Sequence, residues 1–206
     1  MPKNHTDHAD HTSARTVALA IIDMQRDFVD HGAIACVAGA GATIPALARL
    51  LGQARERGWA IFHVTRSHRA DGSDAESFRR DAFAGGRGIC VANTPGAEIV
   101  PALTPLPGET VVHKRRFSAF LYTEFDALLR RRGVRTLVIG GTQYPNCVRA
   151  TAVDAMARDY QTIVVTDCCS AQTPEVAAAN VFDLANMGVA CVDSAGLPAL
   201  LASLRA

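Results

Sequence analysis

The sequence lacks the features that mark several protein classes. Its 206 residues carry 21 basic and 20 acidic side chains, so no excess of positive charge indicates a nucleic-acid surface. No apolar run reaches the roughly 18–20 residues that a membrane span requires. Residues 1–16 are polar and contain no apolar signal core, which predicts a cytoplasmic protein. Aromatic residues make up only 6% of the chain, but apolar residues of all kinds make up 49%, enough for one large core.

The six cysteines lack the spacing of a disulfide framework or of a structural zinc site, because no Cys-x-x-Cys pair is present. Free thiols fit a reducing compartment, in agreement with a cytoplasmic location. The neighbours Cys168 and Cys169 leave a redox role open. Because they lie beside an apolar segment, packing is the simpler interpretation of this pair.

Short apolar segments alternate with longer segments of helical periodicity from residue 17 onward. Strands are expected at 17–22, 59–65, 110–113, 135–139, 162–166 and 189–192. Helices are expected at 44–57, 123–132, 147–159 and 174–187, and the segment 197–204 closes the chain. This alternation predicts an α/β fold whose parallel sheet is flanked by helices on both faces. One domain is expected at 16–206, after a disordered, histidine-containing tail at 1–15.

Three reactive side chains follow predicted strands. Asp23 and Lys114 follow the first and third strands, and Cys147 begins an expected helix. Each has a simple structural explanation, as a capping acid, a solvated lysine and a small buried side chain. Together they suggest chemistry, because ligands bind beyond the carboxyl ends of parallel strands. A helix N-terminus and an ammonium lower the pKa of a thiol, and a carboxylate can accept its proton. The combination favours a nucleophilic Cys147.

The surrounding motifs are more specific. They read AIIDMQRDF at 20–28, KRRFSAF at 114–120 and GGTQYPNCVRAT at 140–151. In this order they resemble the motifs of the isochorismatase-like cysteine hydrolases, which include nicotinamidase-related and streptothricin hydrolase-like amidohydrolases, and the similarity extends over about 17–192. The resemblance implies a Rossmann-like fold, with Asp23 as general base and acid, Lys114 as its electrostatic partner and Cys147 as nucleophile.

The resemblance further implies a cis peptide bond between Thr142 and Gln143. That bond would direct the backbone N–H groups of Gln143 and Cys147 at the oxyanion of a tetrahedral intermediate. The implied reaction is hydrolysis of a C–N bond in a small amide, a urea or carbamoyl compound or a lactam, through a thioester and without a cofactor. A homodimer or homotetramer is also implied. A catalytically inactive or regulatory protein of this fold and a thiol redox enzyme remain as alternatives.

The segment after the second predicted strand departs from the nicotinamidases, which carry an Asp-x-His metal motif there. This chain reads TRSHRADG at 65–72, where His68 and Asp71 do not have that spacing, so we predict no catalytic metal. Residues 66–87 are expected to form part of the substrate mouth. Side chains that flank the motifs are candidate substrate contacts, although two of the phenylalanines fit the core equally well; the candidates are Gln25, Phe28, Arg116, Phe120 and Tyr144.

Overall fold

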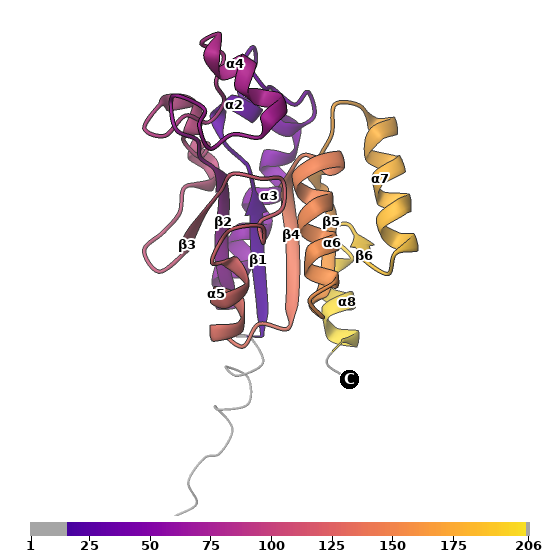
Figure 1. Ribbon diagram of the computed structural model, residues 1–206. Helices are drawn as coiled ribbons and strands as arrows, with labels where there is room; N and C mark the ends of the chain where they lie inside the picture. The colour runs from indigo at the N-terminus through magenta and orange to yellow at the C-terminus, as the bar shows by residue number, and fades with distance from the viewer. Residues whose placement is uncertain (1–15, 205–206) are drawn as a thin grey trace, which may run out of the picture.

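One parallel sheet with the strand order β3-β2-β1-β4-β5-β6 organises the computed structural model, which describes residues 16–204 (Figure 1). Its strands are β1 (Val17–Ile22), β2 (Ala60–Arg66), β3 (Thr110–Lys114), β4 (Thr136–Thr142), β5 (Gln161–Ser170) and β6 (Ala190–Val192). Every pairing in the sheet is parallel. The predicted α/β fold is confirmed. From β1 the chain adds β2 and β3 on one side and then β4, β5 and β6 on the other, so the strand order reverses between β1 and β4. Open α/β sheets bind their ligands at such a reversal.

Helices cover both faces of the sheet (Figure 1). One face packs against α3 (Ala40–Glu56) and α8 (Leu197–Ser203), and the other against α5 (Phe125–Arg131), α6 (Arg149–Met156) and α7 (Pro174–Asn186). The central strand β1 shows why the sheet needs both layers. Its side chains alternate, so that Leu19 and Ile21 face α3 while Ala18, Ala20 and Ile22 face the opposite layer. All six residues of β1 are buried, as expected for a strand covered on both sides.

Short elements gather beyond the carboxyl ends of the strands. They are α2 (Arg26–Val29), α4 (Arg80–Ala84) and three turns of 3₁₀ helix, η1 (Ser77–Arg79), η2 (Pro95–Ala97) and η3 (Pro101–Leu103). Figure 1 shows α2 and α4 above this edge of the sheet. The segment at 66–87 therefore contributes η1 and α4 to the end of the sheet where open α/β sheets bind their ligands.

The chain around Cys147 differs from the sequence prediction. An α-helix was expected to begin at Cys147, but a π-helical turn, η4 (Tyr144–Val148), contains this residue and α6 begins only at Arg149. Pro145 has no backbone N–H to donate, and the carbonyl of Gln143 accepts from both Asn146 and Val148. Cys147 thus lies within a wide turn at the end of β4, and π-helical turns are frequent at functional sites.

Strands β4 and β5 are longer than predicted. Gly141 lets β4 continue past Ile139, because its φ is 123° and a Cβ there would lie 2.1 Å from the carbonyl oxygen of Ile22. The extension of β5 places Cys168 and Cys169 inside the strand, where they belong to the cores on opposite faces of the sheet.

The predicted tail at 1–15 and the last two residues of the predicted domain lie outside the described residues. From residue 16 to residue 204, no helix has both the length and the apolar character of a membrane span.

Candidate active site

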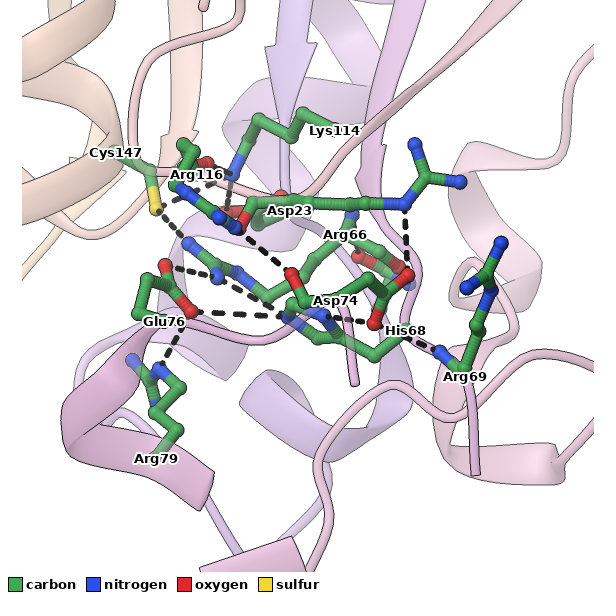
Figure 2. A network of polar contacts seen from close by, with 12 residues as sticks. Asp23, Arg66, His68, Arg69, Asp74, Glu76, Arg79, Lys114, Arg116 and Cys147 are labelled. Atoms are coloured by element: carbon green, nitrogen blue, oxygen red, sulfur yellow. Dashed lines mark hydrogen bonds and ion pairs between the residues drawn. The ribbon is translucent and has the colours of Figure 1, made fainter. Parts of the chain in front are cut away.

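Asp23, Lys114 and Cys147 come into contact beyond the carboxyl ends of the strands (Figure 2). Lys114 Nζ donates to Asp23 Oδ2 at 2.7 Å and lies 3.3 Å from Cys147 Sγ. All three residues are buried, and Cys147 is the most exposed of them at 5%. The side chains expected from the sequence to act together therefore form one cluster.

The ends of β1 and β3 fix the carboxylate and the ammonium. Asp23 adopts a left-handed backbone conformation with φ 51°, and its N–H donates to the carbonyl of Val64 at 2.8 Å. Lys114 is the last residue of β3 and lies opposite Arg66 of β2. Its ammonium also donates to the carbonyl of Arg116 at 3.2 Å, so it has three acceptors for its three hydrogens.

The segment that carries Cys147 follows β4 directly. The peptide bond between Thr142 and Gln143 is cis. Thr142 is buried, and its hydroxyl accepts a hydrogen bond from Ser170 Oγ at 2.9 Å, which ties this segment to the end of β5. Gln143 is half-buried and precedes η4 directly.

The environment of Cys147 keeps its thiol protonated. Burial raises the pKa of the Cys147 thiol, the negative charge of Asp23 raises it further, and the cations Lys114 and Arg66 oppose both effects. The net shift is upward, which corrects the lowering expected from the sequence: desolvation outweighs the nearby ammonium, and Cys147 is not at the start of an α-helix. A buried thiol of this kind needs a base, and Asp23 Oδ1 has no hydrogen-bond partner within residues 16–204.

Arg66 is a third charged group at the sulfur, beside Asp23 and Lys114, and it was not identified from the sequence. Its Nη2 lies 3.7 Å from Cys147 Sγ, and its Nη1 donates to Glu76 Oε1 at 2.7 Å (Figure 2). The side chain is only 1% exposed, and its guanidinium lies over the ring of Phe117 at 5.4 Å. The available sequence signal was a basic residue at the end of a buried strand, a position normally occupied by an apolar side chain.

Four of the five predicted substrate contacts are buried and make contacts within the chain, so their contact with a substrate remains a prediction. The side chain of Gln25 bonds to backbone groups of Arg66 and Ala97. The other three are buried in the core: Phe28 beside Ile89 and Cys90, Phe120 against Phe125 and Tyr160, and Tyr144 with its hydroxyl directed to the carbonyl of Thr166.

Arg116 is the fifth predicted contact, and it borders an open cavity of about 580 Å³. The lining of this cavity also includes Glu76, Phe117 and Asn146, the residue that precedes Cys147. Glu76 brings part of the segment at 66–87 to this cavity, next to the charged cluster. The predicted place of that segment at a substrate mouth remains a prediction.

The residues after β2 do not fit a metal ion. Arg66 and His68 are two positions apart, the spacing of an Asp-x-His pair, but arginine offers no carboxylate to a metal ion. His68 Nε2 lies 3.3 Å from Arg66 Nη1, and Nδ1 lies 3.2 Å from Asp74 Oδ1. A neutral ring satisfies both contacts, and burial together with Arg66 lowers the pKa of His68. A guanidinium therefore occupies the space beside the histidine, and residues 16–204 contain no metal-binding cluster of three His, Cys, Asp or Glu side chains.

Comparisons with known proteins agree with this architecture. The isochorismatase domain model matches residues 17–196. The crystal structure of an isochorismatase family protein from Desulfovibrio vulgaris is 62% identical, with a TM-score of 0.90 over 91% of this chain and 99% of that chain. A probable inactive nicotinamidase of Arabidopsis thaliana is 41% identical over 85% of this chain and 91% of its own length. A maleamate amidohydrolase of Pseudomonas putida is 33% identical over 82% of this chain and 79% of its own length. The chain belongs to the isochorismatase family.

Proposed function

We propose that this chain is a cysteine hydrolase that cleaves the C–N bond of a small amide, a urea or carbamoyl compound, or a lactam through a thioester intermediate. One observation carries the proposal: a single buried ammonium, that of Lys114, contacts both the carboxylate of Asp23 and the thiol of Cys147. Such a site combines a nucleophile, a proton acceptor and a fixed cation. The similarity to a maleamate amidohydrolase supports amide chemistry.

In the first half of the reaction, Asp23 Oδ1 takes the proton of the Cys147 thiol while Sγ attacks the carbonyl carbon. The resulting oxyanion is assigned to the backbone N–H groups of Gln143 and Cys147, and each such donor contributes about 3–4 kcal/mol to transition-state stabilisation. When the C–N bond breaks, Asp23 returns the proton to the leaving nitrogen. An amine or ammonia departs and a thioester remains on Cys147.

In the second half, water hydrolyses the thioester. Asp23 accepts a proton from the attacking water, and the C–S bond breaks to release the acid. The proton on Asp23 then returns to Sγ, which restores the starting state. Lys114 stays charged throughout and holds Asp23 in place, because its ammonium donates to Oδ2 and leaves Oδ1 open for proton transfer.

The alternatives to a hydrolase are a non-catalytic protein and a thiol redox enzyme. A non-catalytic role is suggested by the Arabidopsis relative, whose name describes it as probably inactive. A thiol redox enzyme would need a second reactive cysteine. Cys168 and Cys169 are poor candidates, because both are buried and burial raises the pKa of each thiol. The intact contact among Asp23, Lys114 and Cys147 favours the hydrolase over both.

The substrate is expected to enter by the open cavity beside Glu76, Arg116 and Asn146. A homodimer or homotetramer is also proposed from the family resemblance. Light scattering in solution tests the assembly, and a monomer would contradict it.

The test of function is turnover of a panel of primary amides, ureas, carbamoyl compounds and lactams, with products followed by mass spectrometry so that ring opening is detected as well as ammonia release. Cys147→Ala is expected to abolish turnover, whereas Cys36→Ala, which removes a half-buried thiol outside the site, is expected to leave it unchanged. An acyl group on the Cys147 peptide after rapid quenching would identify the thioester. Turnover that persists in Cys147→Ala would refute the proposed mechanism, and no turnover on any class would favour the non-catalytic protein.

A further inference from the structure

We propose that Arg66 is a further catalytic residue of this site: its buried guanidinium is a fixed cation that stabilises negative charge on Cys147 Sγ, and Glu76 holds it there. The inference rests on the proposed function, since it assigns a role within that reaction. It starts from the 3.7 Å contact between Arg66 Nη2 and Cys147 Sγ, with both side chains buried.

The backbone of Arg66 is held in place by Gln25. The side-chain oxygen of Gln25 accepts from Arg66 N–H at 2.7 Å, and its amide nitrogen donates to the Arg66 carbonyl at 2.8 Å. The same nitrogen donates to the carbonyl of Ala97, also at 2.8 Å. Gln25 is fully buried and continues the hydrogen bonding of β2 beyond the end of β1. Its role is therefore to fix the strand end from which Arg66 extends.

The guanidinium is held equally firmly. Glu76 Oε1 accepts from Nη1 at 2.7 Å, His68 Nε2 lies 3.3 Å from the same nitrogen, and the ring of Phe117 lies under the guanidinium carbon. Asp74 in turn holds His68. Burial on its own would lower the pKa of Arg66, but Cys147, Asp23 and Glu76 together raise it, so the side chain remains a cation.

The proton transfer explains why a second cation is needed. The charged groups around Sγ are Asp23 after β1, Arg66 on β2 and Lys114 on β3, with Glu76 and Arg79 of the η1 region behind Arg66. When the thiol proton moves to Asp23 Oδ1, the negative charge moves from a carboxylate 2.7 Å from Lys114 to a sulfur 3.3 Å from it. Arg66 compensates for this weaker contact, because the charge arrives beside its Nη2.

The position of Arg66 supports the same role. It is the last residue of β2, and it places a permanent positive charge next to His68. Its Nε is buried without a hydrogen-bond partner within residues 16–204, so the guanidinium still has a donor to offer when substrate enters. A purely structural arginine would be expected to use all its buried donors.

Two substitutions with opposite expected effects test the proposal. The rate at which iodoacetamide, itself a small amide, alkylates the Cys147 peptide is measured by mass spectrometry as a function of pH. Arg66→Gln keeps a donor for Glu76 but removes the positive charge. The midpoint of the pH profile should therefore rise by one pH unit or more, so that alkylation at a pH below the midpoint is at least tenfold slower. Glu76→Gln keeps an acceptor for Arg66 but removes the opposing charge, so the midpoint should fall.

Arg66→Lys keeps the charge and should recover most of the profile. Arg132→Gln is the matched control, because its guanidinium also lies over a phenylalanine ring, that of Phe62 at 5.0 Å, and its profile should match the wild type. A reactive Cys147 whose midpoint does not rise in Arg66→Gln would overturn the role of Arg66 alone. If Arg66→Gln does not fold, Glu76→Gln decides instead: a pH midpoint that is not lowered in that variant would also overturn the role of Arg66. If Cys147 is not alkylated at any pH, in the wild type or in any variant, the proposed function is overturned as well.

Discussion

Two ionic clusters, one buried and one partly buried, include residues of strand β2, and they differ in how completely their atoms are paired. At the carboxyl end lies the cluster around Cys147. On the strand itself, His63 contacts Glu109, which also binds Arg55 of α3. The Glu109 carboxylate accepts from Arg55 Nε at 2.6 Å and Nη2 at 3.1 Å and from the N–H of Leu106 at 3.0 Å, and His63 Nε2 lies 2.8 Å from it.

The polar atoms of the cluster around Cys147 are paired less completely. We call it the open cluster, and the cluster around Glu109 the closed cluster. Within residues 16–204, six buried side-chain atoms have no hydrogen-bond partner, and four of them belong to the open cluster. Two of the four, Glu76 Oε2 and Arg79 Nε, form an ion pair with each other at 3.4 Å, which leaves Asp23 Oδ1 and Arg66 Nε unpaired. The Glu109 cluster contributes only His63 Nδ1. Leaving such atoms unpaired costs about 1–3 kcal/mol each, so a cluster that retains them is suited to binding another molecule rather than to stabilising the fold.

The largest expected effects are those of substitutions in the open cluster, where one substitution should lower activity and another should lower both activity and stability. Asp23→Asn removes the proton acceptor, and general bases contribute about 10²–10⁴-fold, so kcat/KM on an amide substrate should fall by about a thousandfold. Lys114→Met should abolish activity too and also destabilise the protein by about 3–5 kcal/mol, because it leaves the Asp23 carboxylate buried and unpaired. Urea unfolding and steady-state kinetics measure the two effects.

The double variant Asp23→Asn/Lys114→Met sharpens the comparison. It removes both charges, so it should regain most of the stability lost in Lys114→Met while remaining inactive. A double variant as unstable as Lys114→Met would mean that the pair supports the fold in the way the Glu109 cluster does.

The closed cluster should show the reverse pattern, with a smaller effect. Glu109→Gln weakens the contacts to Arg55 and His63 and should lower the free energy of unfolding by about 1–3 kcal/mol, with kcat/KM unchanged. The matched control is Glu98→Gln, whose partner Arg26 is at 3.7 Å on the exposed surface and whose loss should not be measurable. A fall in kcat/KM for Glu109→Gln would show that the two clusters are coupled through β2.

The sequence predicts features that depend on neighbouring residues, and it does not predict those that depend on residues far apart in the chain. The strands were predictable because β1 is a continuous apolar run, and Asp23 and Lys114 were predictable because each stands where a strand ends. Such signals are local. The roles of Arg66 and Gln25 are not local, because they depend on a hydrogen-bonded pair of residues 41 positions apart.

The remaining differences have similar causes. The extension of β4 depends on the close approach of Gly141 to Ile22, which only the assembled sheet reveals. Phe120 and Tyr144 lie in the motifs around Lys114 and Cys147 in sequence, yet both are buried in the core. Adjacency in sequence to Lys114 and Cys147 therefore does not determine whether a side chain is exposed, whereas position at a strand end did predict that Asp23 and Lys114 lie together.

The smallest expected effect is the pH dependence of the closed cluster. Although burial opposes ionisation, hydrogen bonds from Arg55, Leu106 N–H and His63 lower the pKa of Glu109 to about 2 from an ordinary value of 4.5. A carboxylate with a depressed pKa stabilises the fold fully above its unfolded pKa and loses that contribution as the pH falls toward its folded pKa. The difference in unfolding free energy between wild type and Glu109→Gln should therefore be constant above about pH 5 and shrink between pH 4.5 and 2. Urea titrations at pH 7, 4.5 and 3 measure it. A difference that stays constant down to pH 3 would mean that Glu109 stabilises the fold by packing rather than by charge, and the contrast between a closed ionic cluster and an open one would then rest on the Cys147 site alone.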